Sequence, residues 1–322
     1  KFHDSFYYLK KQAFATVLGI VLMLFVAGMD YHIWQRLAVF GYLAAVALSV
    51  AVMLFGREIN GSKRWLALGP FSFQPSEFAK VALILFLADL VTKNVKTIGK
   101  MWTLCRIMFW ILPIVGLVGA SNLSTAIIIL GIGVILIFVA SPKYAQFAMM
   151  GIAGACFMGI FLALESYRLE RLAIWRNPEK YEKGYQTLQG LYAIGSGGVF
   201  GVGIGNSVQK LGFVPEAQND MIFSIICEEL GLAGAGIIVF LFLLLIWRFF
   251  LIASGSRDLF GALIATGAMA HMMIQVILNI AVVTNTIPNT GITLPFISYG
   301  GTSVMFLLIE MGLVLSVSQV VD

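Results

Sequence analysis

Charged residues are scarce in this chain of 322 residues: Asp, Glu, Lys and Arg together make up 11% of it, whereas 60% of it is hydrophobic. A soluble domain carries roughly 25% charged residues. A surface that faces water cannot be assembled from so few charges, but a surface that faces lipid can. The sequence therefore predicts an integral membrane protein.

Cysteine and clustered basic charge are also scarce. The three cysteines lie in apolar runs without the spacing of metal ligands or of a disulfide framework, so we expect them to pack in the core. The net charge of +5 is small, and no basic cluster is interleaved with aromatic residues, which argues against nucleic acid as a partner. No cleavable signal peptide is visible, and the loop-like first residues suggest that the natural N-terminus lies further upstream.

Nine apolar runs are long enough to cross a membrane, since a spanning helix needs about 20 residues. They cover 12–29, 37–55, 76–92, 104–120, 122–140, 144–164, 221–250, 259–283 and 299–320. The run 221–250 is longer than a bilayer requires, so we expect it to tilt or to project beyond the lipid. With no internal repeat, the chain is predicted to be a single domain over 1–322: an all-α, polytopic transmembrane helix bundle.

Two connections are long, 56–75 and 165–220, and nine spans place both on the same side of the membrane. Loops longer than about 15 residues are usually functional or disordered. The second connection contains Trp175, Tyr181 and Tyr185, which are not typical of disorder. We therefore predict that 165–220 is a large, folded extracytoplasmic loop over the outer face of the bundle.

The orientation follows from the basic residues of the short loops. Loops 93–103, 141–143 and 251–258 share one side and contain Lys or Arg, which indicates the cytoplasm. Loop 284–298 has no charge and suits the outer side. The two long outer connections are nevertheless basic, and an anionic ligand on the outer face would account for some of that charge.

Ionisable side chains in or beside apolar spans are costly and are the first candidates for function. Asp220 opens the 221–250 span, and Ser224 and Glu228 lie on its face of the helix. At the mouth of a water-filled cavity Asp220 could act as a general base, or it could simply stabilise the helix N-terminus. For Glu228 and Glu229 we expect structural roles, through pairing with a base or accepting backbone hydrogen bonds.

A second group of candidates precedes and opens the 76–92 span. In QPSEFAK, residues 74–80, Glu77 is an acid in the first helical turn. Lys80 could pair with it, snorkel to the interface, or bind phosphate as a point charge. Arg64 in GSKRWLALG either binds an anion or is an interfacial residue beside Trp65.

Glycine is concentrated in IGSGGVFGVGIGN, residues 194–206, which has neither the preceding strand nor the pattern of a phosphate-binding loop. Its glycines at a spacing of four could let a short helix pack closely, or they could permit tight turns in a re-entrant segment. In LPFISYGGTS, residues 294–303, Gly300 and Gly301 are expected to form the turn before the last span.

Two further ionisable groups lie inside spans. His271 has no His, Cys or acid at ligand spacing, so a buried core histidine is the simpler interpretation. Glu310 lies deep in the last span, where it would suit a transporter better than an enzyme.

Four strings together resemble the SEDS family, the shape, elongation, division and sporulation proteins of bacteria. They are NGSKRWLALGPFSFQPSEFAK, GYQTLQGLYAIGSGG, GNSVQKLGFVPEAQNDMIFSIICEELG and TLPFISYGGTS. The resemblance extends from about residue 6 to residue 318, and it is nearer to the division and sporulation branch than to the elongation branch.

The resemblance implies ten transmembrane helices with both ends in the cytoplasm, of which nine are visible. It also implies a peptidoglycan glycosyltransferase that polymerises lipid II on the outer face of the bacterial cytoplasmic membrane. The expected partner is a class B penicillin-binding protein, in the divisome or a related complex. No cofactor is evident and a metal site is unknown, although a divalent cation could assist with the pyrophosphate.

The resemblance also implies residue roles. The essential aspartate of the family matches Asp220, which becomes the candidate general base. The candidate substrate-binding residues are Arg64, Lys80, Glu77 and Ser224, and the candidate supporting residues are Glu228, Glu229, Gly300 and Gly301. One departure is clear: many members have Gln-Pro-Asp-x-Gly between the two middle spans, but here the string is Ala-Ser-Asn-Leu-Ser, so that Asn122 replaces the acid.

Two other classes of function remain open. A flippase for lipid II predicts charged groups distributed through the depth of the bundle, and a scaffold that only docks a penicillin-binding protein predicts no catalysis. Arg64, Lys80, Asp220 and the long loop all map to the predicted outer side, which favours the enzyme.

Overall fold

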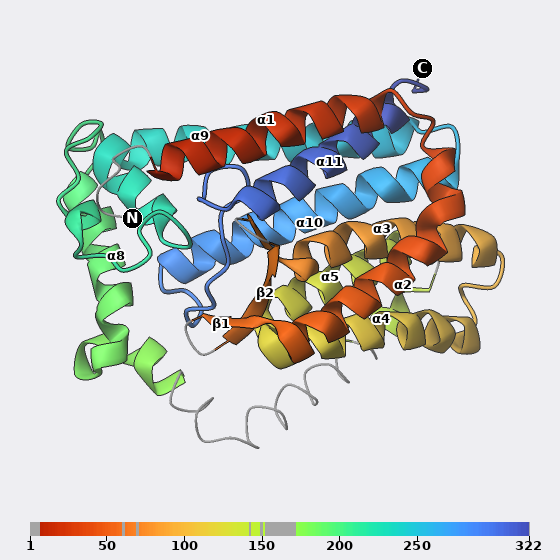
Figure 1. The fold of residues 1–322 in the computed structure, drawn as a ribbon, viewed down its shortest axis with the longest axis horizontal. Coiled ribbons are helices and arrows are strands. Elements are labelled where there is room, and N and C mark those ends of the chain that lie inside the picture. The colour runs from red at the N-terminus through yellow and green to blue at the C-terminus, as the bar shows by residue number, and fades with distance from the viewer. Residues whose placement is uncertain are drawn as a thin grey trace. The chain divides into compact units, whose positions relative to one another are not determined.

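The computed structural model describes residues 7–59, 62–68, 71–141, 143–148, 151 and 172–321, and that part of the chain is mainly helical (Figure 1). It forms two compact units. The first consists of Lys1–Pro142, Ile246–Ile274 and Tyr299–Asp322, and the second of Lys143–Leu245 and Gln275–Ser298. The predicted all-α membrane fold is confirmed.

Among the described residues, the first unit contains six whole helices and the parts of two more that fall in 246–274. Four of them follow each other along the chain and pack together: α2 (His32–Phe55), α3 (Pro75–Asn94), α4 (Met101–Ser121) and α5 (Leu123–Ala140). The helix α1 (Tyr7–Ala27) lies alongside α11 (Gly301–Ser318), as Figure 1 shows. Because α3 contacts α2, α4, α5 and α11, it is the most buried helix of the unit.

Seven described helices are long and apolar enough to cross a membrane: α1, α2, α4, α5, α9 (Ile222–Gly255), α10 (Leu259–Val283) and α11. They match seven of the nine predicted spans. The predicted span 76–92 is the helix α3, whose Glu77, Lys80, Asp89 and Lys93 shorten its apolar run. The predicted span 144–164 lies mostly outside the described residues, so the expected number of nine stays a prediction.

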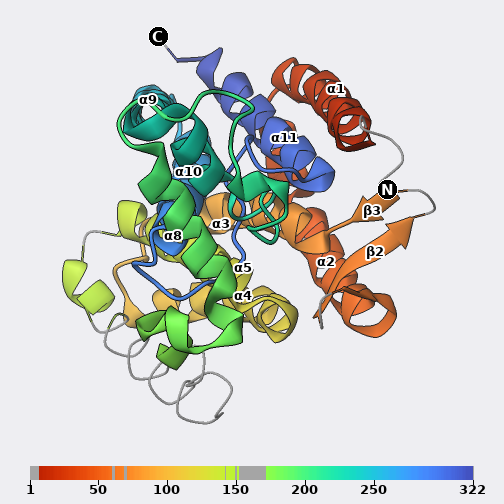
Figure 2. The ribbon, with the colours of Figure 1, turned by 90° about the vertical axis from the view of Figure 1, so that its left-hand side faces the viewer.

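The connection 56–75, interpreted above as a loop, contains a small antiparallel sheet that the sequence did not reveal. Its strands are β1 (Arg57–Ile59), β2 (Ser62–Leu68) and β3 (Phe71–Phe73), in the order β1-β2-β3. The strand β2 also contacts the ends of α2, α3 and α4, and Figure 2 shows β2 and β3 as a hairpin beside α2. Strands of three to seven residues are too short to give a clear alternating pattern.

The described part of the 165–220 loop belongs to the second unit and is folded. It contains a helical turn at 172–176, the 3-10 turns η1 (Pro178–Lys180) and η2 (Glu182–Gly184), the helix α8 (Tyr185–Gly197) and the turn η3 (Gln209–Leu211). The indole of Trp175 donates a hydrogen bond of 2.9 Å to the carbonyl of Asn285, which ties this loop to the 284–298 loop. Residues 165–171 lie outside the described residues.

The helix α9 has a break near its N-terminal end. It is 34 residues long, which corresponds to about 50 Å at 1.5 Å per residue, against about 30 Å of hydrocarbon in a bilayer. Within it Gly231 has φ +66° and ψ −169°, a conformation that is left-handed and open in practice only to glycine. The break separates the first nine residues of α9 from the part that continues to Gly255.

The packing of α1 on α11 depends on a glycine. A Cβ atom at Gly312 would lie 2.6 Å from the backbone oxygen of Met23, whereas one at Gly116 in α4 would meet nothing within 4 Å. We predict that Gly312→Leu lowers stability by about 1–3 kcal/mol, since a backbone atom cannot rotate away. Thermal unfolding in detergent measures the effect, with Gly116→Leu as the matched control, and equal midpoints for the two variants would contradict the proposed close contact.

Candidate functional site

Asp220 lies in the second unit, just before α9, and is 8% exposed. The amide of Asn279 on α10 donates to the backbone oxygen of Asp220 at 2.9 Å and to that of Ile292 at 2.7 Å. The hydroxyl of Ser298 donates to the backbone oxygen of Asn219 at 2.6 Å. These bonds fix the backbone around Asp220 to α10 and to the 284–298 loop.

The carboxylate of Asp220 accepts hydrogen bonds from backbone amides and has one long contact with a side chain. The amide of Gln186 on α8 lies 3.5 Å from Oδ1, at the limit of a hydrogen bond. On the other side is Gly291, where a Cβ atom would come within 3.7 Å of Oδ2 and where φ is +67°. The carboxylate is therefore buried but weakly solvated, and a side chain at 291 would crowd it.

This environment changes the affinity of Asp220 for a proton. Burial, which penalises the charged form, raises its pKa from 3.8 to about 6, and the nearby negative charge of Glu216 adds to the rise. Hydrogen bonds from Gln186 and from backbone amides oppose it. A carboxylate with a pKa near neutrality is well matched to exchanging a proton at physiological pH.

The other acids of α9 have contacts of a structural kind. The carboxylate of Glu228 accepts hydrogen bonds from the hydroxyl of Ser207 and, at 3.1 Å, from the backbone amide of Val208. Glu229 accepts one from the ammonium of Lys210 at 2.6 Å. Both carboxylates hold the 207–210 turn against α9.

Ser224, one of the substrate-binding candidates, lies four residues after Asp220, in the first turn of α9. Its side chain is completely buried, and its hydroxyl donates to the backbone oxygen of Met221 at 2.7 Å. It packs beneath α8, where a Cβ atom at Gly190 would come within 3.7 Å of that hydroxyl. Any substrate contact for Ser224 remains a prediction.

In the first unit, Glu77 and Lys80 form a buried ion pair on α3. The ammonium of Lys80 lies 2.9 Å from the carboxylate of Glu77, and the two side chains are 2% and 8% exposed, respectively. Snorkelling of Lys80 to the membrane interface, one of the interpretations above, is therefore wrong. An intrahelical pair at i, i+3 was among the alternatives. Because this pair is buried, removing one partner would destabilise the protein far more than removing one partner of a surface pair.

His271 on α10 pairs with Glu310 on α11, since its Nδ1 atom lies 2.7 Å from a carboxylate oxygen of Glu310 and both side chains are 2% exposed. Glu77 interacts electrostatically with His271 as well. The first unit thus contains two buried pairs in electrostatic contact. The sequence placed His271 in the core, but it could not reveal its partner 39 residues away.

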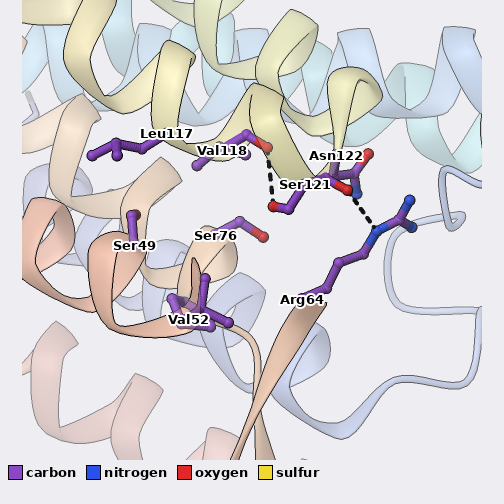
Figure 3. A pocket seen from close by; sticks show the side chains of 9 residues that line it. Ser49, Val52, Arg64, Ser76, Leu117, Val118, Ser121 and Asn122 are labelled. Atoms are coloured by element: carbon purple, nitrogen blue, oxygen red, sulfur yellow. Dashed lines mark hydrogen bonds between the residues drawn. The ribbon is translucent and has the colours of Figure 1, made fainter. Parts of the chain in front are cut away.

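Arg64 projects from β2 into a cleft of the first unit (Figure 3). Its Nε atom donates to the backbone oxygen of Ser121 at 3.1 Å, at the end of α4. The cleft is small, and its lining combines apolar and polar side chains: Ser49, Val52, Arg64, Pro75, Ser76, Leu117, Val118, Ser121 and Asn122. Arg64 is the one charged residue of this lining, which favours an anionic group there.

Asn122, the residue that replaces the usual acid, caps two helices. Its backbone amide donates to the backbone oxygen of Val118 near the end of α4, at 2.7 Å. Its side-chain oxygen accepts from the amide of Thr125 in the first turn of α5, at 3.3 Å. Asn122 therefore caps both helices, and as a neutral residue it adds no negative charge to the described lining of the cleft.

The glycines before α11 differ from the expected turn. Neither Gly300, with φ 173°, nor Gly301 has a positive φ in the left-handed range, so no turn there requires glycine. Instead a Cβ atom at Gly301 would come within 3.0 Å of that of Ala15, so its small size lets α11 begin close to α1. Among the described residues, no group of three or more His, Cys, Asp and Glu side chains is placed to hold a metal ion.

Fold and buried polar groups define a polytopic membrane protein with ionisable residues kept inside its helical units. A sequence profile of the cell cycle proteins FtsW, RodA and SpoVE matches residues 1–322, and the chain belongs to this family. The SEDS resemblance is thereby confirmed.

Individual relatives agree with this assignment. The stage V sporulation protein E of Bacillus subtilis is 40% identical over 99% of this chain and 89% of its own length. The probable peptidoglycan glycosyltransferase FtsW of a Geobacter species is 34% identical, over 99% and 88% of the two chains.

Solved structures match as well. A chain of a peptidoglycan synthase complex that coordinates polymerization and crosslinking is similar with a TM-score of 0.86 and 30% identity, over 97% of this chain and 89% of that one. The rod shape determining protein RodA of Thermus thermophilus is similar with a TM-score of 0.73 and 29% identity, over 98% and 88%.

The raised pKa of Asp220 predicts a stability effect with a definite sign. Between pH 4 and 6 the folded protein retains a proton that the unfolded chain has lost, so the wild type loses stability as the pH rises through this window. Asp220→Asn removes that loss. From pH 4 to pH 7 the free energy of unfolding of Asp220→Asn should therefore rise by roughly 3 kcal/mol relative to that of the wild type.

Chemical unfolding at several pH values measures this difference. Asp30→Asn is a suitable control, because the pKa of the exposed Asp30 is lowered by hydrogen bonds from His32, which predicts the opposite sign. If the stability difference between Asp220→Asn and the wild type did not change with pH, Asp220 would titrate as an ordinary exposed carboxyl.

Proposed function

We propose that the chain is a peptidoglycan glycosyltransferase that polymerises lipid II, with Asp220 as its general base. The observation that carries the proposal is the buried, weakly solvated carboxylate of Asp220, whose pKa is raised to about 6. Membership of the family and relatives named as probable peptidoglycan glycosyltransferases support it.

The reaction joins the 4-hydroxyl of an acceptor N-acetylglucosamine to the anomeric carbon of a donor N-acetylmuramic acid. In this proposal the carboxylate of Asp220 takes the hydroxyl proton as the oxygen attacks. The bond from the anomeric carbon to the pyrophosphate breaks, and undecaprenyl pyrophosphate leaves with the electron pair. Because attack and departure occur on opposite faces, the configuration inverts. A base with a pKa near 6 is largely ionised at neutral pH and can still accept a proton.

Cations are required where the negative charge of the leaving group develops. Arg64 is the more accessible candidate, since it is partly exposed and lines a cleft without acidic residues. Lys80 is buried in its pair with Glu77, so its contribution would be that of a fixed, already oriented charge. A divalent cation carried by the pyrophosphate could share this task.

The proposed partner is a class B penicillin-binding protein in a cell-wall synthesis complex, for which the similar chain of a peptidoglycan synthase complex is the support. We propose that Asp220 faces the outside of the cytoplasmic membrane. The basic short loops, among them 93–103 with three lysines, support this orientation because such loops are usually cytoplasmic.

Transport of lipid II is the second candidate function, and the buried pairs favour it. Glu77 with Lys80 and His271 with Glu310 lie inside the helical unit, as charged groups do in many transporters. Purified protein in detergent distinguishes the two functions, because polymerisation needs no closed membrane and translocation does. Glycan polymer formed from lipid II in detergent would support the enzyme.

We predict that Asp220→Asn reduces glycan polymerisation on the order of a hundredfold or more, because it removes the base and keeps the shape. Wild-type activity should fall about tenfold per pH unit below pH 6, as the base becomes protonated. The measurement is glycan length and yield from purified lipid II, with pull-down of the penicillin-binding protein as the control for folding. Equal polymer from both proteins would remove Asp220 as the base.

The buried pair on α3 needs a paired substitution. Lys80→Ala alone would leave Glu77 charged and unpaired, at a cost of about 3–5 kcal/mol, so loss of activity could reflect unfolding. Glu77→Gln with Lys80→Met keeps the volumes and removes both charges of the pair, so that neither is left unpaired. We predict that this double variant keeps its thermal stability and loses most of its polymerisation.

The matched control is Lys93→Met with Asp89→Asn. This variant neutralises the second ion pair of α3, in which the lysine is 62% exposed. It should polymerise as the wild type does. Full activity of the Glu77→Gln, Lys80→Met variant would reduce the buried pair to a packing role.

A further inference from the structure

The loop after α8 exposes a dense set of apolar side chains. Seven of them in residues 199–213 are between 43% and 84% exposed: Val199, Phe200, Val202, Ile204, Val208, Leu211 and Phe213. Phe200 and Ile204 are the most exposed, at 84% and 82%. So many strongly exposed apolar side chains within 15 residues are rare in contact with water and mark a segment that something covers.

The same loop is bonded to α9 at its break. The backbone amides of Val202 and Gly203 donate to the carbonyls of Glu228 and Glu229, at 2.9 and 3.0 Å. On the other side of the break, the amides of Leu232 and Ala233 donate to Gly198 and Val199, each at 3.0 Å. The loop thus replaces the helical hydrogen bonds that the break removes.

The glycines of the loop make this contact close enough. A Cβ atom at Gly197 would lie 1.9 Å from the backbone oxygen of Cys227, and one at Gly201 would lie 2.1 Å from that of Glu229. Gly201 also has φ +77°. Of the two interpretations of this glycine run, tight turns describe residues 198–206, since α8 ends at Gly197.

The break also separates two surfaces of α9. Before it, the side chains of Phe223, Ser224 and Cys227 are buried. After it, Leu232, Ile237 and Phe240 are 57–62% exposed, as expected for a helix that faces lipid. The 24 residues from Leu232 to Gly255 extend about 36 Å, which is enough to cross about 30 Å of hydrocarbon. The break, and the loop bonded to it, therefore lie near one edge of the hydrocarbon.

Ser207 and Lys210 of the loop turn towards α9, and the exposed Asn206 donates to the backbone oxygen of Val202, which suits the same location. Ser207 is 2% exposed and bonds Glu228, and Lys210 bonds Glu229. The outward side chains Phe200, Ile204 and Leu211 are apolar. A segment with satisfied polar groups on one side and bulky apolar groups on the other is suited to the boundary between headgroups and acyl chains.

We propose that residues 198–213 form an interfacial anchor whose partner is the lipid bilayer itself. The apolar side chains insert into the leaflet adjacent to the N-terminal end of α9, next to the exposed apolar side chains of α9 that begin at Leu232. Through its bonds to Glu228 and Glu229 the anchor sets the depth of the first turns of α9, which Asp220 precedes. The insertion does not depend on the proposed function.

Site-directed spin labelling of the full chain tests this proposal. The native cysteines at 105, 156 and 227 are first replaced by alanine, and single cysteines are placed as Phe200→Cys, Ile204→Cys and Val208→Cys. The labelled protein is reconstituted in bilayers of phosphatidylcholine and phosphatidylglycerol. Collision rates with oxygen, which concentrates in lipid, and with a water-soluble nickel chelate then report the location of each label.

Two controls define the scale: Phe240→Cys on the lipid-facing part of α9, and Glu179→Cys in the exposed turn η1. Labels at 200, 204 and 208 should match the label at 240, with an oxygen-to-nickel ratio several-fold above that at 179. Labels that behave like the one at 179 would place the loop in water and overturn the anchor. Labels shielded from both reagents would mean that a protein surface covers the patch, which also overturns it.

Discussion

Every polar group kept away from water in this protein needs a partner inside the protein, and the bilayer makes that requirement strict. The break at Gly231 illustrates it for the backbone. Helical bonds are lost there, and the amides and carbonyls around the break bond instead to Gly198, Val199, Val202 and Gly203. Side chains meet the same requirement on α3, where the buried Lys80 and Glu77 pair with each other at 2.9 Å. The first case gives a structural role to the glycine-rich loop, and the second gives one to the two charged residues at the start of α3.

Asp220 is held in a different way, and the difference is informative. Its backbone is fixed by Asn279, while its carboxylate has a long contact of 3.5 Å with Gln186 and backbone hydrogen bonds that offset its burial only in part. Burial without full hydrogen bonding raises the pKa, which costs stability at neutral pH. A group kept in a costly state by a rigid surrounding is typical of functional sites, because strain there is retained only when the fold over-determines the position.

The sequence was sufficient for the helices, because apolar runs of about 20 residues are an unambiguous signal, and α10 begins and ends where it was predicted. It was also sufficient for Asp220 as a candidate, since an acid beside a span is rare. It could not reveal the sheet at 57–73, whose strands are too short, or the pairing of His271 with Glu310, whose residues share no local pattern. The neighbours of Asp220 on α8 and α10 were missed for the same reason: tertiary contacts fix them.

The two ends of the first nine residues of α9 are held independently. At one end Asn279 and Ser298 bond the backbone at 219–220, and at the other the glycine-rich loop bonds Glu228 and Glu229. A short helical segment fixed at both ends has little freedom to rotate or slide, so the carboxylate that precedes it keeps its position without needing strong bonds of its own. This resolves an apparent conflict, because a general base must be precisely placed and yet must remain free to accept a proton. The break at Gly231 makes the segment short enough to be held in this way, and a continuous helix would instead couple Asp220 to every movement of the 24 residues beyond it.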